Sequence, residues 1–242
     1  KTERAFDPFF KKAKSVLTVH NLAYQGHFSH RQYESLGLDP ELYHVDGFEF
    51  YGKANILKAG LLFSDFITTV SPTYAKEIQT KEFGFGLEGV VKKKADRLRG
   101  ILNGLDYDIW NPAKDKNIKK NYSAARPEGK AACKAHLQAS TGLEVNPEIP
   151  LYAAVTRLAE QKGLDILSEA CDGFLSQGTQ FVLLGDGDAV YKTTFRNVAN
   201  RHPGKAAVYL DFDAKKAHEI YAGAAFFLMP SYFEPCGLGQ MI

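Results

Sequence analysis

The sequence predicts an α/β protein with two domains built on parallel sheets, and three observations lead to this prediction. Strands and helices alternate from Leu151 to Met229, which is the pattern of a doubly wound parallel sheet. The length of 242 residues allows one large domain or two modest ones. Asn, Lys, Pro and Ser dominate residues 111–127, as in a linker. We therefore place the boundary near Asp106, with residues 1–105 in the first domain and residues 106–242 in a linker and the second.

The composition is that of an ordinary globular protein, with 45% hydrophobic and 24% charged residues. A net charge of +2 and an isoelectric point near 8.3 do not indicate a nucleic-acid partner. Basic clusters such as Lys92–Lys94 are interpreted as solvated faces. No apolar run approaches the ~20 residues that a membrane helix needs, so we expect no membrane partner.

The three cysteines, Cys133, Cys171 and Cys236, lie far apart in the chain. They form no CxxC pair and have no His/Cys spacing typical of zinc, so no metal site is expected. Their odd number and the absence of a disulfide pattern indicate a reducing compartment, the cytoplasm or the plastid of a plant or alga. The chain begins at Lys1 without an initiator Met or a signal peptide, and we expect it to be an internal piece of a longer protein.

The first half contains alternating apolar and polar segments that predict strands 15–20, 66–70 and 98–102 and helices 55–63 and 71–78. The first strand ends at His20-Asn21 before a glycine-bearing loop, which is typical of the edge of a site. A histidine that merely caps a strand is the alternative. Ser71 and Pro72 match the N-cap and the first position of a helix. The glycine-rich loop 83–89 lacks the order of a phosphate-binding loop.

The second half predicts a regular series of strands 151–156, 181–184, 206–210 and 224–229 and helices 128–137, 164–174, 191–199 and 214–221. In a parallel sheet of this kind, the carboxyl ends of the strands lie at one edge, where ligands bind. The residues that follow the four strands should therefore line one cleft. They are Arg157 with Lys162, Gly185–Gly187, Asp211-Phe212 and Ser231–Gly237.

Arg157 and Lys162 bracket a turn after the first of these strands. Two cations near a helix N-terminus suit a diphosphate, because Arg offers a planar fork and Lys a compact charge. The backbone N–H groups that follow Cys236-Gly237-Leu238 would add donors. The alternative is a pair of exposed charges at a turn, partnered by Glu160.

Glu234 lies between an aromatic residue and a proline at the centre of the predicted edge. A carboxylate held there could accept hydrogen bonds from sugar hydroxyls, and a surface loop Glu is the alternative. Cys236 is interpreted as a packing residue, because no His dyad accompanies it. Phe212 could stack on a base, although a core position is favoured. The segment Gly185–Asp188 does not match a dinucleotide fingerprint. A loop that approaches a ligand closely and a simple turn are equally good interpretations of it.

Five segments resemble one family: 18–26 (TVHNLAYQG), 70–75 (VSPTYA), 102–104 (LNG), 156–163 (TRLAEQKG) and 234–238 (EPCGL). They occur in the same order in bacterial glycogen synthases and plant starch synthases, and together they are specific. The resemblance implies a GT-B architecture, with two Rossmann-like domains whose parallel sheets face a cleft. Both domains would be incomplete in this chain, and an isolated piece of this kind is expected to be nearly inactive.

The resemblance also implies an activity, the transfer of glucose from ADP-glucose to the non-reducing end of an α-1,4-glucan such as glycogen or starch. The anomeric configuration would be retained, and no metal or other cofactor would be needed. The implied catalytic residues are His20, Arg157, Lys162 and Glu234. The implied substrate-binding residues are Asn21, Asn103, Phe212, Cys236, Gly237, Leu238 and Gly239.

The implied roles differ among these residues. Arg157 and Lys162 would neutralise the diphosphate of the leaving ADP, His20 would contact the transferred glucose, and Glu234 would bind glucose hydroxyls. The N–H groups of residues 237–239 would hold phosphate, and Phe212 would lie against adenine. The family's N-terminal Lys-Thr-Gly-Gly-Leu loop and C-terminal Thr-Gly-Gly-Leu segment are absent from the sequence, and some relatives carry a hydroxyl residue at position 239.

Two alternatives to a glucan synthase stay open. One is a non-catalytic module of the same fold that binds glucan or nucleotide, although such a binder would not need His20, Arg157, Lys162 and Glu234 together. The other is another retaining GT-B enzyme, such as a sucrose synthase or a phosphorylase. A phosphorylase would need a lysine for pyridoxal phosphate in its own sequence context, and the sequence shows none.

Overall fold

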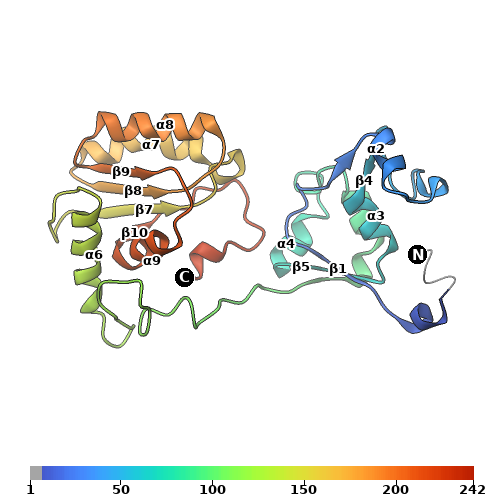
Figure 1. Cartoon of the computed structure of the whole chain (residues 1–242), viewed down its shortest axis with the longest axis horizontal. Helices are drawn as coiled ribbons and strands as arrows, with labels where there is room; N and C mark the ends of the chain where they lie inside the picture. Colours follow the sequence, from blue (N-terminus) through green and yellow to red (C-terminus); the bar gives the residue numbers. More distant parts are fainter. Residues whose placement is uncertain (1–6) are drawn as a thin grey trace. The chain divides into compact units, whose positions relative to one another are not determined.

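The computed structural model describes residues 7–242, and the chain divides into two compact units, Lys1–Asn103 and Gly104–Ile242. Each unit has a parallel sheet of its own with helices packed on it (Figure 1). Among the helices of residues 7–242, none is both long enough and apolar enough to cross a membrane.

The parallel sheet of unit 1 has the strand order β1-β5-β6, formed by β1 (Val16–Val19), β5 (Phe66–Thr69) and β6 (Leu98–Gly100). Val19 is paired with Thr69, and Thr69 with Gly100, so the three strands end level at one edge. All three strands were expected from their β-branched and apolar residues, and the structure confirms them.

The helices of unit 1 are α3 (Ile56–Phe63), α4 (Pro72–Glu77) and α5 (Glu88–Lys93), together with α2 (His30–Ser35) and the 3₁₀ turns η1 (Pro8–Lys12), η2 (Pro40–Leu42) and η3 (Ala95–Arg97). Ser71 caps α4 as expected, because its hydroxyl accepts a hydrogen bond from the N–H of Tyr74 at 2.9 Å. Helix α5 occupies the end of the segment that the sequence predicted to be only a glycine-rich loop.

Unit 1 also contains a small antiparallel sheet, β2-β4-β3, that the sequence did not predict. It is formed by β2 (His27–Phe28), β4 (Lys53–Asn55) and β3 (Glu49–Phe50). Strands of two or three residues are too short to show a period-two pattern, which explains the omission. Next to it, the rings of Tyr33 and Phe48 lie with their centroids 5.2 Å apart.

The sheet of unit 2 has the strand order β10-β7-β8-β9 and is parallel throughout, as the alternating pattern predicted. Its strands are β7 (Leu151–Val155), β8 (Gln180–Leu184), β9 (Ala206–Tyr209) and β10 (Phe226–Phe227). Helices α7 (Leu164–Ser176) and α8 (Ala189–Arg201) cover one face, and α6 (Gly129–Ser140) and α9 (Ala214–Gly223) cover the other (Figure 1). Two buried clusters result, one on each face, so β8 is buried along its whole length.

The last strand of this sheet is the one that the sequence predicted least well. A buried strand was expected over residues 224–229, but β10 has only two residues and lies at the edge of the sheet. It pairs with β7 alone, and Phe226 is exposed while its ring stacks on that of Tyr152 at 5.0 Å.

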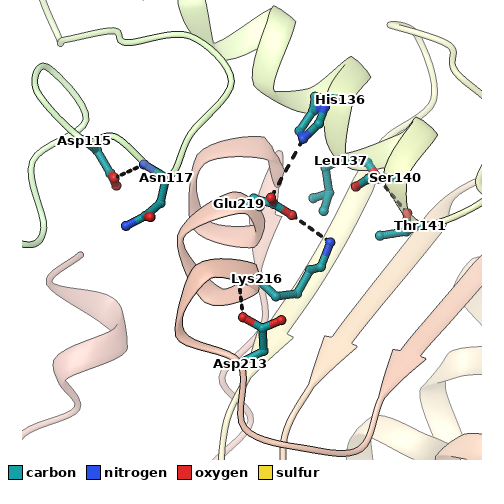
Figure 2. Close-up of polar contacts among 9 residues, drawn as sticks. All are labelled: Asp115, Asn117, His136, Leu137, Ser140, Thr141, Asp213, Lys216 and Glu219. Carbon is teal, nitrogen blue, oxygen red and sulfur yellow. Dashed lines mark hydrogen bonds and ion pairs between the residues drawn. The ribbon is translucent and has the colours of Figure 1, made fainter.

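A group of partly buried ionisable side chains holds helix α9 against α6. Figure 2 shows His136 of α6 and Lys216 of α9 both directed at Glu219, with distances of 3.8 Å and 2.7 Å to its carboxylate oxygens. Asp213 caps α9 by accepting a hydrogen bond from the N–H of Lys216 at 2.9 Å. A Cβ at Gly223 would lie 2.8 Å from the Cβ of Leu137, so a glycine is needed where the two helices touch.

Residues 111–127, which belong to unit 2, contain turns and no regular helix or strand. Part of this segment packs against the rest of the unit. The ring of Trp110 stacks on that of His218 in α9, with centroids 4.0 Å apart and an interplanar angle of 7°. Asp115 accepts the hydrogen bond from His218 Nδ1 at 2.5 Å, and it also caps its own turn by accepting from the N–H of Asn117 (Figure 2).

Candidate functional site

The turn after β7 brings Arg157 and Lys162 to the carboxyl edge of the sheet of unit 2. A 3₁₀ turn, η4 (Glu160–Lys162), ends at Gly163, which has a φ of +60°. The same glycine is the N-cap of α7. A Cβ at Gly163 would lie 2.1 Å from the carbonyl oxygen of Pro230. Only glycine therefore allows the turn and the loop after β10 to approach so closely.

Gln161 binds that loop, residues 230–237, through two hydrogen bonds. Its backbone carbonyl accepts a hydrogen bond from the N–H of Tyr232 at 3.0 Å, and its side-chain amide donates to the carbonyl of Phe233 at 3.0 Å. The Tyr232 hydroxyl donates to Asp165 at the start of α7, and this bond lowers the pKa of the Asp165 carboxyl. Gln161 was not predicted as a site residue, although its place inside the 156–163 motif was a signal for it.

The loop and the turn enclose a pocket of about 250 Å³, here called the strand-end pocket. The candidate site residues that line it come from the β7 turn and from the loop and turn after β10. They are Arg157, Lys162, Glu234, Gly237, Leu238 and Gly239. Ser231, which the sequence placed at this edge, also lines it, as does Tyr221, which was not predicted.

The centre of the strand-end pocket is an ion pair between Lys162 and Glu234. The Lys162 ammonium lies 2.5 Å from Glu234 Oε1, and the two side chains are only 16% and 18% exposed. The Ser231 hydroxyl donates to the same oxygen at 2.6 Å. Lys162 thus pairs with Glu234 and not with Glu160, which was the partner in the alternative interpretation. The alternative that Glu234 is a surface loop residue is also wrong, because its side chain is largely buried. The Lys162 ammonium has three N–H donors, and its hydrogen bond to Glu234 uses one of them.

The backbone after Glu234 turns sharply at Gly237, whose φ is +70°. A single 3₁₀ turn, η5 (Leu238–Gln240), follows. A Cβ at Gly239 would lie 3.0 Å from the hydroxyl of Tyr221, so a larger residue would press against that ring. Burial raises the pKa of the Tyr221 hydroxyl to about 12. Cys236 is buried, consistent with a packing residue.

Two strand-end groups do not line the strand-end pocket. Gly185 follows β8, and a Cβ there would lie 2.1 Å from the carbonyl of Thr156, so this glycine serves the close approach of β8 to the β7 turn. Gly187 forms a bridge with Leu158 in the same place. Phe212 follows β9 and is 89% exposed, so the favoured interpretation of a core residue is wrong. Because the Phe212 ring is exposed near the end of a strand, it is available for stacking.

In unit 1, His20 and Asn21 follow the end of β1, and His20 is exposed. Tyr74 of α4 holds the loop that begins with these two residues, because its hydroxyl accepts a hydrogen bond from the Leu22 N–H at 2.9 Å. Asn21 Oδ1 accepts from the N–H of Ala23 at 3.0 Å and closes the first turn. Asn103, after β6, is partly buried in the same unit.

The end of this loop is fixed by a buried amide pair that sequence reasoning missed. Asn55 donates from its side-chain nitrogen to Gln25 Oε1 at 2.7 Å, and Gln25 donates to the carbonyl of Phe85 at 3.0 Å. Asn55 Oδ1 also caps α3 through the N–H of Lys58 at 2.8 Å. Because each buried polar atom named here is satisfied, the loop is held in one position.

The part of the chain that the structure describes contains no group of three or more His, Cys, Asp or Glu side chains able to hold a metal ion.

Comparison with known proteins agrees with this arrangement. Residues 1–93 match the family model of the starch synthase catalytic domain. The chain is 47% identical over 241 residues to the glycogen synthase of Pseudothermotoga lettingae, and 50% identical over 235 residues to that of Thermosipho africanus. The matches cover 100% and 97% of this chain, but 50% and 48% of the relatives. The chain therefore spans about half the length of the curated relatives it matches.

A solved structure matches almost the whole chain as well. The catalytic domain of starch synthase IV from Arabidopsis thaliana, bound to ADP and acarbose, superposes with a TM-score of 0.91 at 36% identity. The match covers 98% of this chain and 50% of that one. Two α/β units with parallel sheets and this likeness define the fold as the GT-B type. Within that class, the chain is similar over almost its whole length to glycogen synthases and to a starch synthase.

Proposed function

We propose that the protein to which this sequence belongs is a glycogen or starch synthase. It transfers glucose from ADP-glucose to the non-reducing end of an α-1,4-glucan with retention of configuration. The observation that carries the proposal is the strand-end pocket, in which Arg157, Lys162 and Glu234 line one cavity together with residues 237–239. The glycogen synthase relatives, at 47–50% identity over nearly the whole chain, support it.

The chemistry assigned to the cations follows from the leaving group. Departure of ADP places additional negative charge on the diphosphate, and fixed cations stabilise that charge in the transition state. Lys162 is already oriented by Glu234 at 2.5 Å and by the turn that ends at Gly163. Because the ammonium and the Arg157 guanidinium line the same cavity, one diphosphate can contact both.

Glu234 and the backbone that follows it are assigned to the sugar and the phosphates. Glu234 accepts from Lys162 and Ser231 through Oε1, and we assign hydrogen bonds from glucose hydroxyls to its carboxylate. The N–H groups of Gly237, Leu238 and Gly239 are assigned to phosphate, with Cys236 packed behind them. Phe212, which is bare and follows a neighbouring strand, is assigned to stacking on adenine.

The contribution of unit 1 is assigned from the family resemblance. His20 would contact the transferred glucose, and Asn21 and Asn103 would bind substrate. The loop that carries His20 is fixed by the bond from Leu22 to Tyr74 and by the amide pair of Gln25 and Asn55. A side chain on a loop so held can keep a contact that the reaction needs.

The proposal is tested by titrating the chain with ADP in a calorimeter. Wild type is expected to bind, and Lys162→Ala is expected to weaken binding by about tenfold or more, since charge-assisted bonds contribute about 1.5–3 kcal/mol. Lys192→Ala is the matched control, because Lys192, which lies on α8, pairs with Asp186 and does not line the strand-end pocket. Equal affinities of wild type and Lys162→Ala would refute the phosphate-binding role.

We also place the protein in a reducing compartment, the cytoplasm or a plastid. Cys133, Cys171 and Cys236 are free thiols in this structure, and all three are buried.

A further inference from the structure

Within residues 7–242, Glu234 is the only residue that lines the strand-end pocket with a carboxylate. An ionised carboxylate has about four lone-pair sites, two on each oxygen. Oε1 of Glu234 accepts hydrogen bonds from the Lys162 ammonium at 2.5 Å and from the Ser231 hydroxyl at 2.6 Å. Because these two donors occupy Oε1, a ligand that donates to Glu234 must use the other oxygen.

The other oxygen, Oε2, has no partner and is accessible. It forms no hydrogen bond within the part of the chain that the structure describes. Among the same residues, Oε2 of Glu88 is the only fully buried side-chain polar atom that lacks a partner. Oε2 of Glu234 is therefore unpaired without being sealed inside the protein. A carboxylate oxygen only accepts hydrogen bonds, so this atom suits ligand groups that donate, such as hydroxyls.

The backbone on both sides of Ser231 is fixed to the turn that carries Lys162. Before Ser231, the carbonyl oxygen of Pro230 lies so close to Gly163 that a Cβ there would be 2.1 Å from it. After Ser231, the N–H of Tyr232 donates to the carbonyl of Gln161 at 3.0 Å. The Ser231 hydroxyl and the Lys162 ammonium thus approach Oε1 from elements that are bound to each other.

A local structural role for the Ser231 hydroxyl is a capping box, because the spacing of Ser231 and Glu234 matches that motif. In a capping box, the serine hydroxyl accepts a hydrogen bond from a backbone N–H in the first turn of a helix. The structure differs, since the next helical turn is η5, which begins only at Leu238. The hydroxyl instead donates to the side chain of Glu234. Its contact therefore serves the orientation of the carboxylate.

We propose that Ser231 is a positioning residue for recognition of the donor sugar. Together with Lys162 it holds Oε1 and leaves Oε2 to accept hydrogen bonds from hydroxyl groups of the transferred glucose. The last torsion of a glutamate side chain is broad, so one donor alone does not fix the plane of the carboxylate. The second donor, Ser231, supplies that constraint. The inference rests on the proposed function, which assigns Glu234 to the glucose.

The test compares ADP-glucose with ADP by calorimetry on the 242-residue chain, without glucan. The readout is the Kd for ADP-glucose divided by the Kd for ADP. Glu234→Gln should raise this ratio about tenfold and Ser231→Ala about fivefold, because hydrogen bonds to a charged group are lost or misdirected. Ser231→Thr retains the hydroxyl and should leave the ratio within about twofold of wild type. Ser176→Ala is the matched control, because the Ser176 hydroxyl also makes one hydrogen bond, to the carbonyl of Gly173, but lies outside the strand-end pocket.

A double-mutant cycle separates positioning from a general structural effect. Because Ser231 acts through the carboxylate, adding Ser231→Ala to Glu234→Gln should not raise the ratio further. A further rise in the double variant would overturn the proposal, as would an unchanged ratio in Ser231→Ala alone.

The failures of the two proposals are distinguishable. If Glu234→Gln raises the ratio and Ser231→Ala does not, the role of Ser231 is refuted and the proposed function stands. If Glu234→Gln also leaves the ratio unchanged, the assignment of Glu234 to glucose is refuted together with the role of Ser231. If wild type does not bind ADP, the proposed function itself is refuted.

Discussion

Replacing Gly163 by alanine tests how the strand-end pocket is built. The glycine sits at the junction of η4 and α7 with a φ of +60°. An alanine Cβ would lie 2.1 Å from the carbonyl oxygen of Pro230 and 2.8 Å from its carbonyl carbon. These are backbone atoms, so no side-chain rotation can relieve the contact. The loop that carries Glu234 must move, or the turn that carries Lys162 must change its conformation.

The expected cost has two parts. Holding an alanine in the left-handed region costs about 1–2 kcal/mol. Forcing a methyl group into a filled space costs typically about 1–3 kcal/mol. The free energy of unfolding of unit 2 should therefore fall by about 2–5 kcal/mol. At about 4 °C per kcal/mol for a domain of this size, the melting temperature should fall by about 8–20 °C.

The measurement is thermal unfolding followed by tryptophan fluorescence. The chain has a single tryptophan, Trp110, which stacks on His218 of α9, so its emission reports on unit 2. Gly173→Ala is the matched control within α7, because a Cβ there meets nothing within 4 Å. Alanine in a helix interior should raise stability by about 0.5–1 kcal/mol. A melting temperature of Gly163→Ala within 2 °C of wild type, or an equal loss in the control, would refute the reasoning.

Two further predictions concern unit 2. Asp115→Ala leaves the buried His218 without its partner and should cost about 1–3 kcal/mol in the same fluorescence assay, whereas Asp108→Ala, which removes an exposed carboxylate, should cost less than about 0.5 kcal/mol; similar losses in both would contradict this. Burial raises the pKa of the Cys171 thiol to about 12. Above pH 9 the unfolded chain releases a proton that the folded chain retains, so the free energy of unfolding should decrease as pH rises from about 9 to 12. Urea unfolding at pH 8 and pH 10 should show a smaller decrease for Cys171→Ala, and an unchanged decrease would disprove the assignment.

The sequence determined the regular elements of both units because their patterns are local. The β-branched run at 16–19 and the apolar run at 180–184 became strands, and Ser71 capped α4 with Pro72 in its first turn. The alternation after Leu151 determined the parallel sheet, since strands joined through helices run parallel and their crossovers are almost always right-handed. The motifs also identified the residues that line the strand-end pocket, since they occupy the ends of strands.

Features that depend on partners far apart in the chain could not be predicted from the sequence. The pairing of Lys162 with Glu234 rather than Glu160 spans 72 positions, and it depends on the contact between Gly163 and Pro230. The exposure of Phe212 depends on which segments pack around the end of β9. The β3–β4 hairpin could not be recognised in the sequence, because both strands are too short to show a period. Local patterns set the elements, whereas packing between distant segments set the charges and cavities of the site.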